Sequence, residues 1–241
     1  CAQRVCTSVP YNIGKPYHAG ASADSMRHVY YLGWLMQIIS EAARILRDGG
    51  TLFLQVGSTR DESDTLVPID MLIFDAIKRT GLTFQSRVAW VVGHGLTPKK
   101  RLSERYETAL IFSKGDPSVF NPAPARTPQK QPGKRSFKGP NKGRLSGHPQ
   151  GAWPSNVWNI PNVGHNHPER TGHPAQFPLE LARRAVQLYT NPGDLVIDPF
   201  SGSGTTHVAC IETHRSFSGC DLFYEDIRDK RISAANPDHV C

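Results

Sequence analysis

A glycine-rich turn near the end of the chain carries residue types that could bind a small molecule. Residues 196–206 form an apolar run, VID, that breaks into PFSGSGTT before the apolar residues VACI. This pattern predicts a strand, a tight turn and the start of a helix. Gly202 and Gly204 have no Cβ, so a ligand could approach the backbone closely and reach the free N–H groups of the helix N-terminus. Such turns are common in α/β proteins, so the turn alone also suits a purely structural role.

Asp221 narrows the choice of ligand. It lies 17 residues after Gly204, directly after the predicted strand 216–220. In a doubly wound sheet, the carboxyl ends of neighbouring strands face one crevice, where a carboxylate can accept the hydroxyl hydrogens of a ribose. The FSGSGT turn lacks the three-glycine spacing of a dinucleotide site and the Gly-Lys pair of a P-loop. The combination favours a nucleoside without a pyrophosphate, and S-adenosylmethionine fits that description.

Alternating strands and helices must position these residues. The sequence predicts a strand that ends near Ser8 and leads into an ordered loop, since Pro10 and Pro16 exclude a helix there. Apolar periodicity then predicts a mixed α/β fold with a mainly parallel sheet and one reversed strand near its edge. The predicted helices are 29–47, 66–80, 177–189, 207–213 and 224–234, and the further predicted strands are 51–56, 83–92, 105–113, 196–198 and 216–220.

Length and composition describe one α/β domain with a long insertion. The chain has 241 residues, with neither an apolar run of membrane-spanning length nor a signal-peptide pattern, so we expect a cytoplasmic protein. The five cysteines are scattered without a CxxC pair. His165, His167 and His173 have no matching ligands at a recognisable spacing, so no metal site is expected.

Within the insertion, residues 115–172, the segment 117–168 holds the whole excess of positive charge. Residues 117–168 contain no Asp or Glu, while the rest of the chain balances 21 basic against 21 acidic residues. This distribution predicts contact with a polyanion such as double-stranded DNA, although the composition also suits a solvated, disordered loop. The apolar residues Trp153, Val157, Trp158 and Ile160 are expected to pin the insertion to the core, with base stacking as the alternative. The basic residues are Arg126, Lys130, Lys134, Arg135, Lys138, Lys142 and Arg144.

Three segments together resemble the motifs of the amino-group DNA methyltransferases. Residues 198–206, DPFSGSGTT, resemble the cofactor-binding motif of that family, and residues 7–11, TSVPY, resemble its catalytic Ser-Pro-Pro-Tyr tetrad. Residues 173–178, HPAQFP, are similar to the segment that helps hold the methionine end of the cofactor. The order of catalytic motif, basic region and cofactor motif resembles the β class, found in restriction–modification systems.

This resemblance implies a Rossmann-like, S-adenosylmethionine-dependent methyltransferase with circularly permuted motifs. Residues 1–114 would form the catalytic half, residues 115–172 the target-recognition insertion and residues 173–241 the cofactor-binding half. Residues 105–107 fall where the family has a further motif near the target base. The implied catalytic residues are Ser8, Val9, Pro10 and Tyr11, and the implied cofactor-binding residues are His173, Phe177, Asp198, Phe200, Ser201, Gly202, Ser203, Gly204, Thr205 and Asp221. Asp198 would contact the amino-acid part of the cofactor or fix the loop.

The implied chemistry needs hydrogen-bond acceptors around an exocyclic amine, whose lone pair is delocalised into the base. The hydroxyl of Ser8 and the carbonyls of the Val9–Pro10 turn suit that role, and Tyr11 offers a face for a flipped base. A leading serine favours N4 of cytosine, with N6 of adenine as the alternative. Val9 stands where the family usually has proline, which loosens the turn and leaves open a catalytically weakened cofactor- and DNA-binding module. Methylation of RNA or protein is a more distant alternative, and oligomeric state is not predicted.

Overall fold

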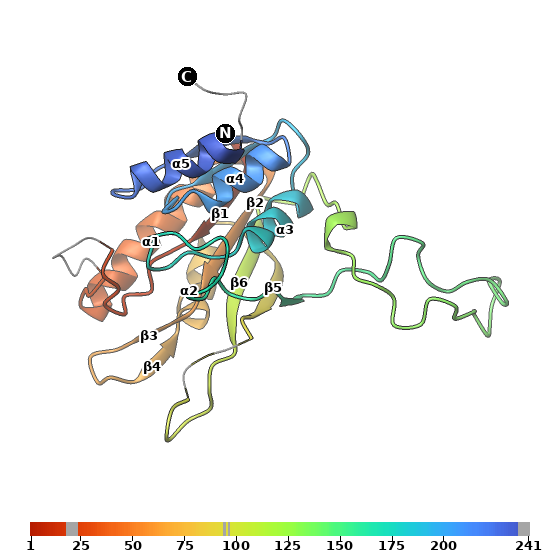
Figure 1. Cartoon of the computed structure of the whole chain (residues 1–241), viewed down its shortest axis with the longest axis horizontal. Helices are drawn as coiled ribbons and strands as arrows, with labels where there is room; N and C mark the ends of the chain where they lie inside the picture. Colours follow the sequence, from red (N-terminus) through yellow and green to blue (C-terminus); the bar gives the residue numbers. More distant parts are fainter. Residues whose placement is uncertain (18–23, 94, 96, 236–241) are drawn as a thin grey trace.

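A seven-stranded mixed sheet forms the centre of the computed structural model, which describes residues 1–17, 24–93, 95 and 97–235 (Figure 1). The strand order is β7-β5-β6-β2-β1-β8-β9. β6 runs antiparallel to both of its neighbours, and the other pairings in this sheet are parallel. The single reversed strand predicted from the sequence is therefore present. The strands are β1 (Ala2–Ser8), β2 (Leu46–Val56), β5 (Thr83–Val91), β6 (Tyr106–Ser113), β7 (Val157–Asn159), β8 (Leu195–Asp198) and β9 (Ser216–Gly219).

Helices cover both faces of the sheet. Successive residues of a strand point to opposite faces, and the central strands carry apolar side chains on each face, so both faces must be buried. On β1, Val5 packs into the core beneath α1 and α2, whereas Cys6 packs into the core beneath α3 and α4. α5 lies beside α4. No helix in the described part of the chain is long and apolar enough to cross a membrane. The helices are α1 (His28–Ile45), α2 (Ile69–Arg79), α3 (Leu179–Leu188), α4 (Thr205–Glu212) and α5 (Glu225–Ala235).

Two predicted boundaries are wrong. The helix predicted from residue 66 begins at Ile69, because β4 (Leu66–Pro68) pairs with β3 (Ser58–Arg60) in a small hairpin. β2 begins at Leu46, directly after α1, so the two glycines expected to end the helix lie inside a strand. There the backbones crowd together: a Cβ on Gly50 would lie 2.8 Å from the carbonyl oxygen of Arg47. Glycine therefore permits a close backbone approach here rather than ending a helix.

Within the insertion, a basic finger (residues 126–152) extends away from the body of the molecule (Figure 1). Backbone hydrogen bonds close it, including those from Ser136 N to Arg144 O at 2.9 Å and from Ala152 N to Thr127 O at 2.8 Å. The insertion also contains a short 3₁₀ helix, Ala123–Ala125, and strand β7, which extends the sheet beyond β5.

Two of the four apolar residues expected to anchor the insertion are buried in the core. Trp158 and Ile160 are buried, and Trp158 stacks on Phe53 with ring centroids 6.1 Å apart. Val157 is exposed because neighbouring residues of β7 face opposite sides of the sheet. Trp153 is 63% exposed and packs instead against Arg126 at the base of the finger.

Candidate active site

The loop that begins at Ser8 and the turn that begins at Pro199 leave the same edge of the sheet. β1 and β8 are adjacent and parallel, with Val5 opposite Ile197. A buried carboxylate joins the two segments: the hydroxyl of Thr7 donates to Asp198 Oδ1 at 2.6 Å, and the hydroxyl of Thr206 donates to Asp198 Oδ2 at 2.6 Å. The carboxyl edge of the sheet therefore brings the predicted catalytic and cofactor-binding segments together.

Asp198 lies beneath the turn, with none of its surface exposed. Its Oδ1 also accepts a hydrogen bond from the backbone N–H of Phe200 at 3.0 Å. Burial raises the pKa of Asp198 to about 6, and the hydrogen bonds from Thr206, Thr7 and Phe200 oppose that rise. The contacts of this side chain are those of a residue that fixes the loop, which is one of the two roles expected from the sequence.

The glycine turn has the backbone geometry that its sequence predicts. Gly202 and Gly204 have φ angles of +47° and +77°, in the region that favours glycine. The N–H of Gly202 donates to Asp221 Oδ2 at 2.8 Å, which ties the turn to the residue after β9. His173 packs on the other side, where a Cβ on Gly202 would lie 2.7 Å from its Nε2 atom. Burial lowers the pKa of His173 to about 4, so its ring is neutral near pH 7.

The other predicted cofactor residues lie in and around the turn, with one exception. Phe200 contacts Trp34 of α1 edge-on, with ring centroids 5.5 Å apart. Ser201, Ser203 and Thr205 are buried within the turn and the start of α4. Phe177 instead packs, half-buried, against the core on the α3–α4 face.

Two arginines of α5 hold the turn from outside. Arg231 Nη1 donates to the carbonyl and hydroxyl oxygens of Ser203 at 2.9 and 3.0 Å and to Thr205 Oγ1 at 2.8 Å. Arg228 covers Gly204, where a Cβ would lie 2.8 Å from its Cγ atom. Sequence reasoning missed both arginines, because α5 has no buried residues and its polar pattern does not show which cations face inward.

Four polar side chains form a hydrogen-bond network at the predicted catalytic loop. Ser8 Oγ donates to Gln55 Oε1 at 2.5 Å. Gln55 Nε2 donates to the hydroxyl oxygen of Tyr11 and to Glu107 Oε2, both at 2.5 Å, and the Tyr11 hydroxyl donates to Glu107 Oε2 at 2.7 Å. Burial raises the pKa values of Tyr11 and Glu107. We term Ser8, Gln55, Tyr11 and Glu107 the Ser8 network.

α1 supports the rest of the catalytic loop. Val9 is 2% exposed and belongs to the same apolar core as Tyr31. The hydroxyl of Tyr31 donates to the carbonyl oxygen of Pro10 at 2.8 Å. A valine at position 9 therefore fills core volume beneath the loop, and one lone pair of the Pro10 carbonyl is already engaged.

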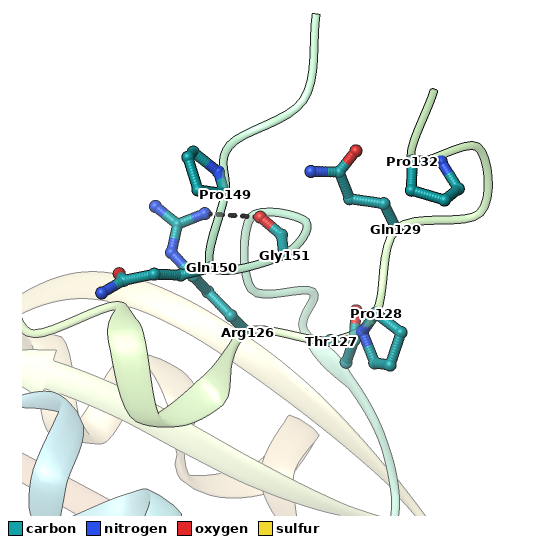
Figure 2. A pocket seen from close by; sticks show the side chains of 8 residues that line it. All are labelled: Arg126, Thr127, Pro128, Gln129, Pro132, Pro149, Gln150 and Gly151. Atoms are coloured by element: carbon teal, nitrogen blue, oxygen red, sulfur yellow. Dashed lines mark hydrogen bonds between the residues drawn. The ribbon is translucent and has the colours of Figure 1, made fainter. Parts of the chain in front are cut away.

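Cavities lie next to Asp221 and at the base of the finger. One, of about 410 Å³, is lined by residues 221–228, including Asp221. The other, of about 350 Å³, lies at the base of the finger, where Arg126 Nη1 donates to the carbonyl oxygen of Gly151 at 2.9 Å (Figure 2). Gln129 and Gln150 line the second cavity as well.

The predicted DNA-binding cations lie on the finger rather than beside Ser8. Arg126 is at its base, with its guanidinium 5.3 Å from the Trp153 ring centroid. The other six are exposed along the finger: Lys130, Lys134, Arg135, Lys138, Lys142 and Arg144. Within the described residues, no three His, Cys, Asp or Glu side chains are grouped as a metal ion would require.

The N6_N4_Mtase family of DNA methylases matches residues 2–229, and the chain belongs to this family. The type II methyltransferase M.BglII of Bacillus subtilis is 39% identical over 236 residues, which cover 97% of this chain and 64% of that protein. The DNA adenine methyltransferase YhdJ of Escherichia coli strain K12 is 29% identical over 221 residues, 91% of this chain and 71% of that protein. The chain thus spans less than two thirds of the length of M.BglII.

A solved structure has the same fold. The PvuII DNA methyltransferase, cytosine-N4-specific, is similar with a TM-score of 0.67 and 18% identity, covering 97% of this chain and 85% of that one. The Rossmann-like α/β methyltransferase fold predicted from the sequence is confirmed.

Proposed function

We propose that this protein transfers a methyl group from S-adenosylmethionine to the exocyclic N4 amine of a cytosine in double-stranded DNA. The family supports a DNA methylase. The observation that carries the proposal is the position of Asp198, whose carboxylate accepts hydrogen bonds from Thr7, directly before Ser8, and from Thr206, directly after the turn. One buried group therefore sets the loop that would face the amine and the turn that would face the methyl donor in a fixed relation.

The residues around the turn fit S-adenosylmethionine. Each carboxylate oxygen of Asp221 accepts one backbone N–H, from Gly202 and from Phe223, and keeps lone pairs for ribose hydroxyls. Beyond it lies a cavity with apolar side chains, including Leu222, for an adenine ring. Gly202, Gly204 and His173 would border the amino-acid part. When bound, the cofactor supplies a methyl group made electrophilic by a sulfonium.

The catalytic loop would hold the amine. Ser8 Oγ donates its hydrogen to Gln55 and keeps its lone pairs for an N–H of the base. The carbonyl of Pro10 accepts from Tyr31 and has a second lone pair to offer. Acceptors at these positions favour a pyramidal amine whose lone pair can attack. The Tyr11 hydroxyl is hydrogen-bonded within the Ser8 network, so the contact of Tyr11 with the base would be stacking by its ring.

DNA contact is assigned to the insertion. The target base must leave the duplex to reach Ser8, so the protein has to hold DNA that is locally opened. Six exposed cations on the finger supply phosphate affinity without competing carboxylates. In this proposal residues 1–114 orient the amine, residues 115–172 hold the target DNA and residues 173–241 hold the cofactor.

Cytosine is the proposed base because a serine leads the catalytic loop, as the resemblance to N4-specific enzymes implies. N6 methylation of adenine is the second candidate, and the 29% identity to the DNA adenine methyltransferase YhdJ favours it. Both bases present an amine beside a ring-nitrogen acceptor, so the same loop chemistry serves either one.

The test is incubation of the protein with methylation-free genomic DNA and S-adenosylmethionine, followed by mass spectrometry of the digested nucleosides. We expect N4-methylcytosine, with its rate reduced about 100-fold by Ser8→Ala because an acceptor for the amine is lost. Ser40→Ala, on the exposed face of α1, is the matched control and should leave the rate unchanged. N6-methyladenine would establish the second candidate. Binding of DNA and cofactor with no methylated nucleoside would instead identify a catalytically weakened module.

A further inference from the structure

The hydrogen bonds of the Ser8 network all run in one direction. A hydroxyl has one hydrogen and two lone pairs, and the hydrogen of Ser8 is directed at Gln55 Oε1, 2.5 Å away. The contact with Gln55 therefore uses the hydrogen of Ser8 Oγ and neither of its lone pairs. Ser8 is an acceptor only as long as Gln55 presents its oxygen, rather than its NH₂ group, to the hydroxyl.

The carboxylate of Glu107 fixes the orientation of the Gln55 amide. Gln55 Nε2 lies 2.5 Å from Glu107 Oε2 and 2.5 Å from the Tyr11 hydroxyl oxygen. A rotated amide would place Gln55 Oε1 against a carboxylate oxygen, and two acceptors at that distance repel each other. The Tyr11 hydroxyl also gives its hydrogen to Glu107, so its oxygen is free to accept from Gln55. An acceptor-only carboxylate thus imposes one direction on the whole network.

We propose that Glu107 and Gln55 are positioning residues that keep Ser8 a pure hydrogen-bond acceptor for the target amine. The inference rests on the proposed function, in which Ser8 accepts from an N–H of the base. If the Ser8 hydrogen pointed at the amine, it would bond to the nitrogen lone pair. That lone pair forms the new N–CH₃ bond while the S–CH₃ bond breaks and an N–H proton passes to water. A serine in the wrong orientation would therefore hydrogen-bond to the nitrogen lone pair and keep it from attacking the methyl group.

The network orients Ser8 and does not relay protons. Gln55 stands between Ser8 and Glu107, and a carboxamide does not titrate near neutral pH. Gln55 is also 2% exposed, and its position follows from strand register, since it lies directly opposite Ser8 in the β1–β2 ladder. Because Ser8 and Gln55 lie on neighbouring strands, their relative position is rigid, as orientation of the Ser8 hydroxyl by Gln55 requires.

Protonation of Glu107 should remove the direction that it imposes. Burial raises its pKa, opposed by the hydrogen bonds from Tyr11 and Gln55; nearby Glu104 raises it further and Lys15 lowers it. Above this pKa the carboxylate only accepts. As pH falls through it, the carboxyl group gains a hydrogen to donate and Gln55 can rotate, so kcat should decline on the acidic side.

Gln55→Leu tests the positioning role. With the acceptor for the Ser8 hydrogen lost, kcat should fall about tenfold, the value of one hydrogen bond, while the Kd of S-adenosylmethionine from calorimetry stays unchanged. In a Ser8→Ala background the same change should cost nothing more, because Gln55 acts through Ser8. A tenfold loss in that background as well would overturn the proposal. Gln3→Leu, a buried glutamine near the other end of β1, is the matched control and should leave kcat unchanged.

Glu107→Gln tests whether the Glu107 carboxylate sets the orientation of the hydrogen bonds in the Ser8 network. The new amide has hydrogens to donate and does not titrate, so it mimics protonated Glu107, and kcat near pH 7 should fall to the level that the wild type reaches on the acidic side. The acidic decline in kcat should disappear, whereas an unchanged acidic decline would show that Glu107 is not its source. Should the wild-type protein methylate DNA while Gln55→Leu has full kcat, this inference fails and the proposed function stands. Absence of methylation by the wild type would end both.

Discussion

The carboxyl edge of the sheet and the basic finger are held together by different means. At the edge, buried side chains bond across long sequence separations: Thr7 reaches Asp198, 191 residues away, and Ser8 reaches Gln55, 47 residues away. In the finger, backbone groups bond to near neighbours, as from Ser146 N to Lys134 O at 2.9 Å. The edge is held by hydrogen bonds between distant parts of the sequence, whereas the finger is held by hydrogen bonds within its own segment.

This difference matches the two physical tasks of the proposed function. Transfer of a methyl group needs reacting atoms held to within a fraction of an ångström, which buried and satisfied hydrogen bonds provide. Attraction to phosphates acts over the screening length of about 8 Å and tolerates an adaptable surface. The comparison therefore predicts that damage at the edge destabilises the fold, whereas damage in the finger changes binding alone.

Asp198→Ala should have the largest effect. It leaves the hydroxyls of Thr7 and Thr206 and the N–H of Phe200 without their acceptor. Buried donors left unpaired cost about 1–3 kcal/mol each, so the free energy of unfolding should fall by at least about 3 kcal/mol. Urea denaturation measures it. A loss of about 0.5 kcal/mol or less would mean that the edge is not held by this carboxylate.

Asp198→Asn separates the hydrogen bonds from the charge. The pKa of Asp198 is raised to about 6 by burial, so the folded state favours the protonated form. Stability from that preference is present below about pH 4 and is lost as pH rises through about 6, by about 3 kcal/mol. The asparagine variant should lack this loss, and parallel slopes for both proteins between pH 4 and 6 would contradict the assignment.

Neutralising the finger should weaken DNA binding without changing stability. In the variant Lys134→Gln/Lys138→Gln/Lys142→Gln, the slope of log K against log salt should become shallower by about 2 to 3 units. Affinity near 0.1 M salt should fall at least about tenfold. Fluorescence anisotropy with duplex DNA at several salt concentrations measures both quantities, and kcat at saturating DNA should not change.

A charge-matched control decides whether the position of the charge matters. Lys78→Gln/Arg79→Gln/Lys230→Gln removes the same net charge from α2 and α5. Its salt slope should remain close to that of the wild type. If both triple variants lose affinity equally, DNA responds to the overall charge of the protein and the finger has no special role.

The sequence predicted the meeting of Ser8 and Asp198 because parallel strands bring their carboxyl ends to one edge. It did not predict Gln55 as a site residue, although a polar residue opposite Ser8 in an apolar strand was a usable signal. Glu107 lies in a segment that family resemblance placed near the base. Its contacts with the loop depend on β6 being reversed, which brings the start of that strand to the same edge.

Other features depended on contacts that no local pattern encodes. Arg231 and Arg228 lie on a helix without buried residues, so periodicity does not reveal that they face the glycine turn. Trp153 was expected to dock on the core because it is apolar, but the bridge between Thr127 and Ala152 holds it beside Arg126 at the base of the finger. Strand β4 was assigned to a helix because its pairing with β3 is a tertiary contact.

Arg4→Met should have the smallest effect, and in the opposite direction. Arg4 lies on β1, four residues before Ser8, and is fully buried. Nη1 donates to Thr51 Oγ1 at 2.8 Å, but Nε and Nη2 have no hydrogen-bond partner, and burial lowers the pKa of the guanidinium. The rings of Phe53 and Tyr189 lie 5.4 and 5.1 Å from it and offset part of this cost.

If the edge is stable because its buried polar groups are satisfied, an unsatisfied cation on the same strand should be dispensable. Methionine fills a similar volume without charge, so the free energy of unfolding should rise by about 1 kcal/mol, measured by urea denaturation at pH 7. Arg4→Ala, which leaves a cavity, should lower it instead. Should methionine destabilise the protein by as much as alanine does, the stacked guanidinium stabilises the core, and hydrogen-bond satisfaction alone does not explain the stability of this strand.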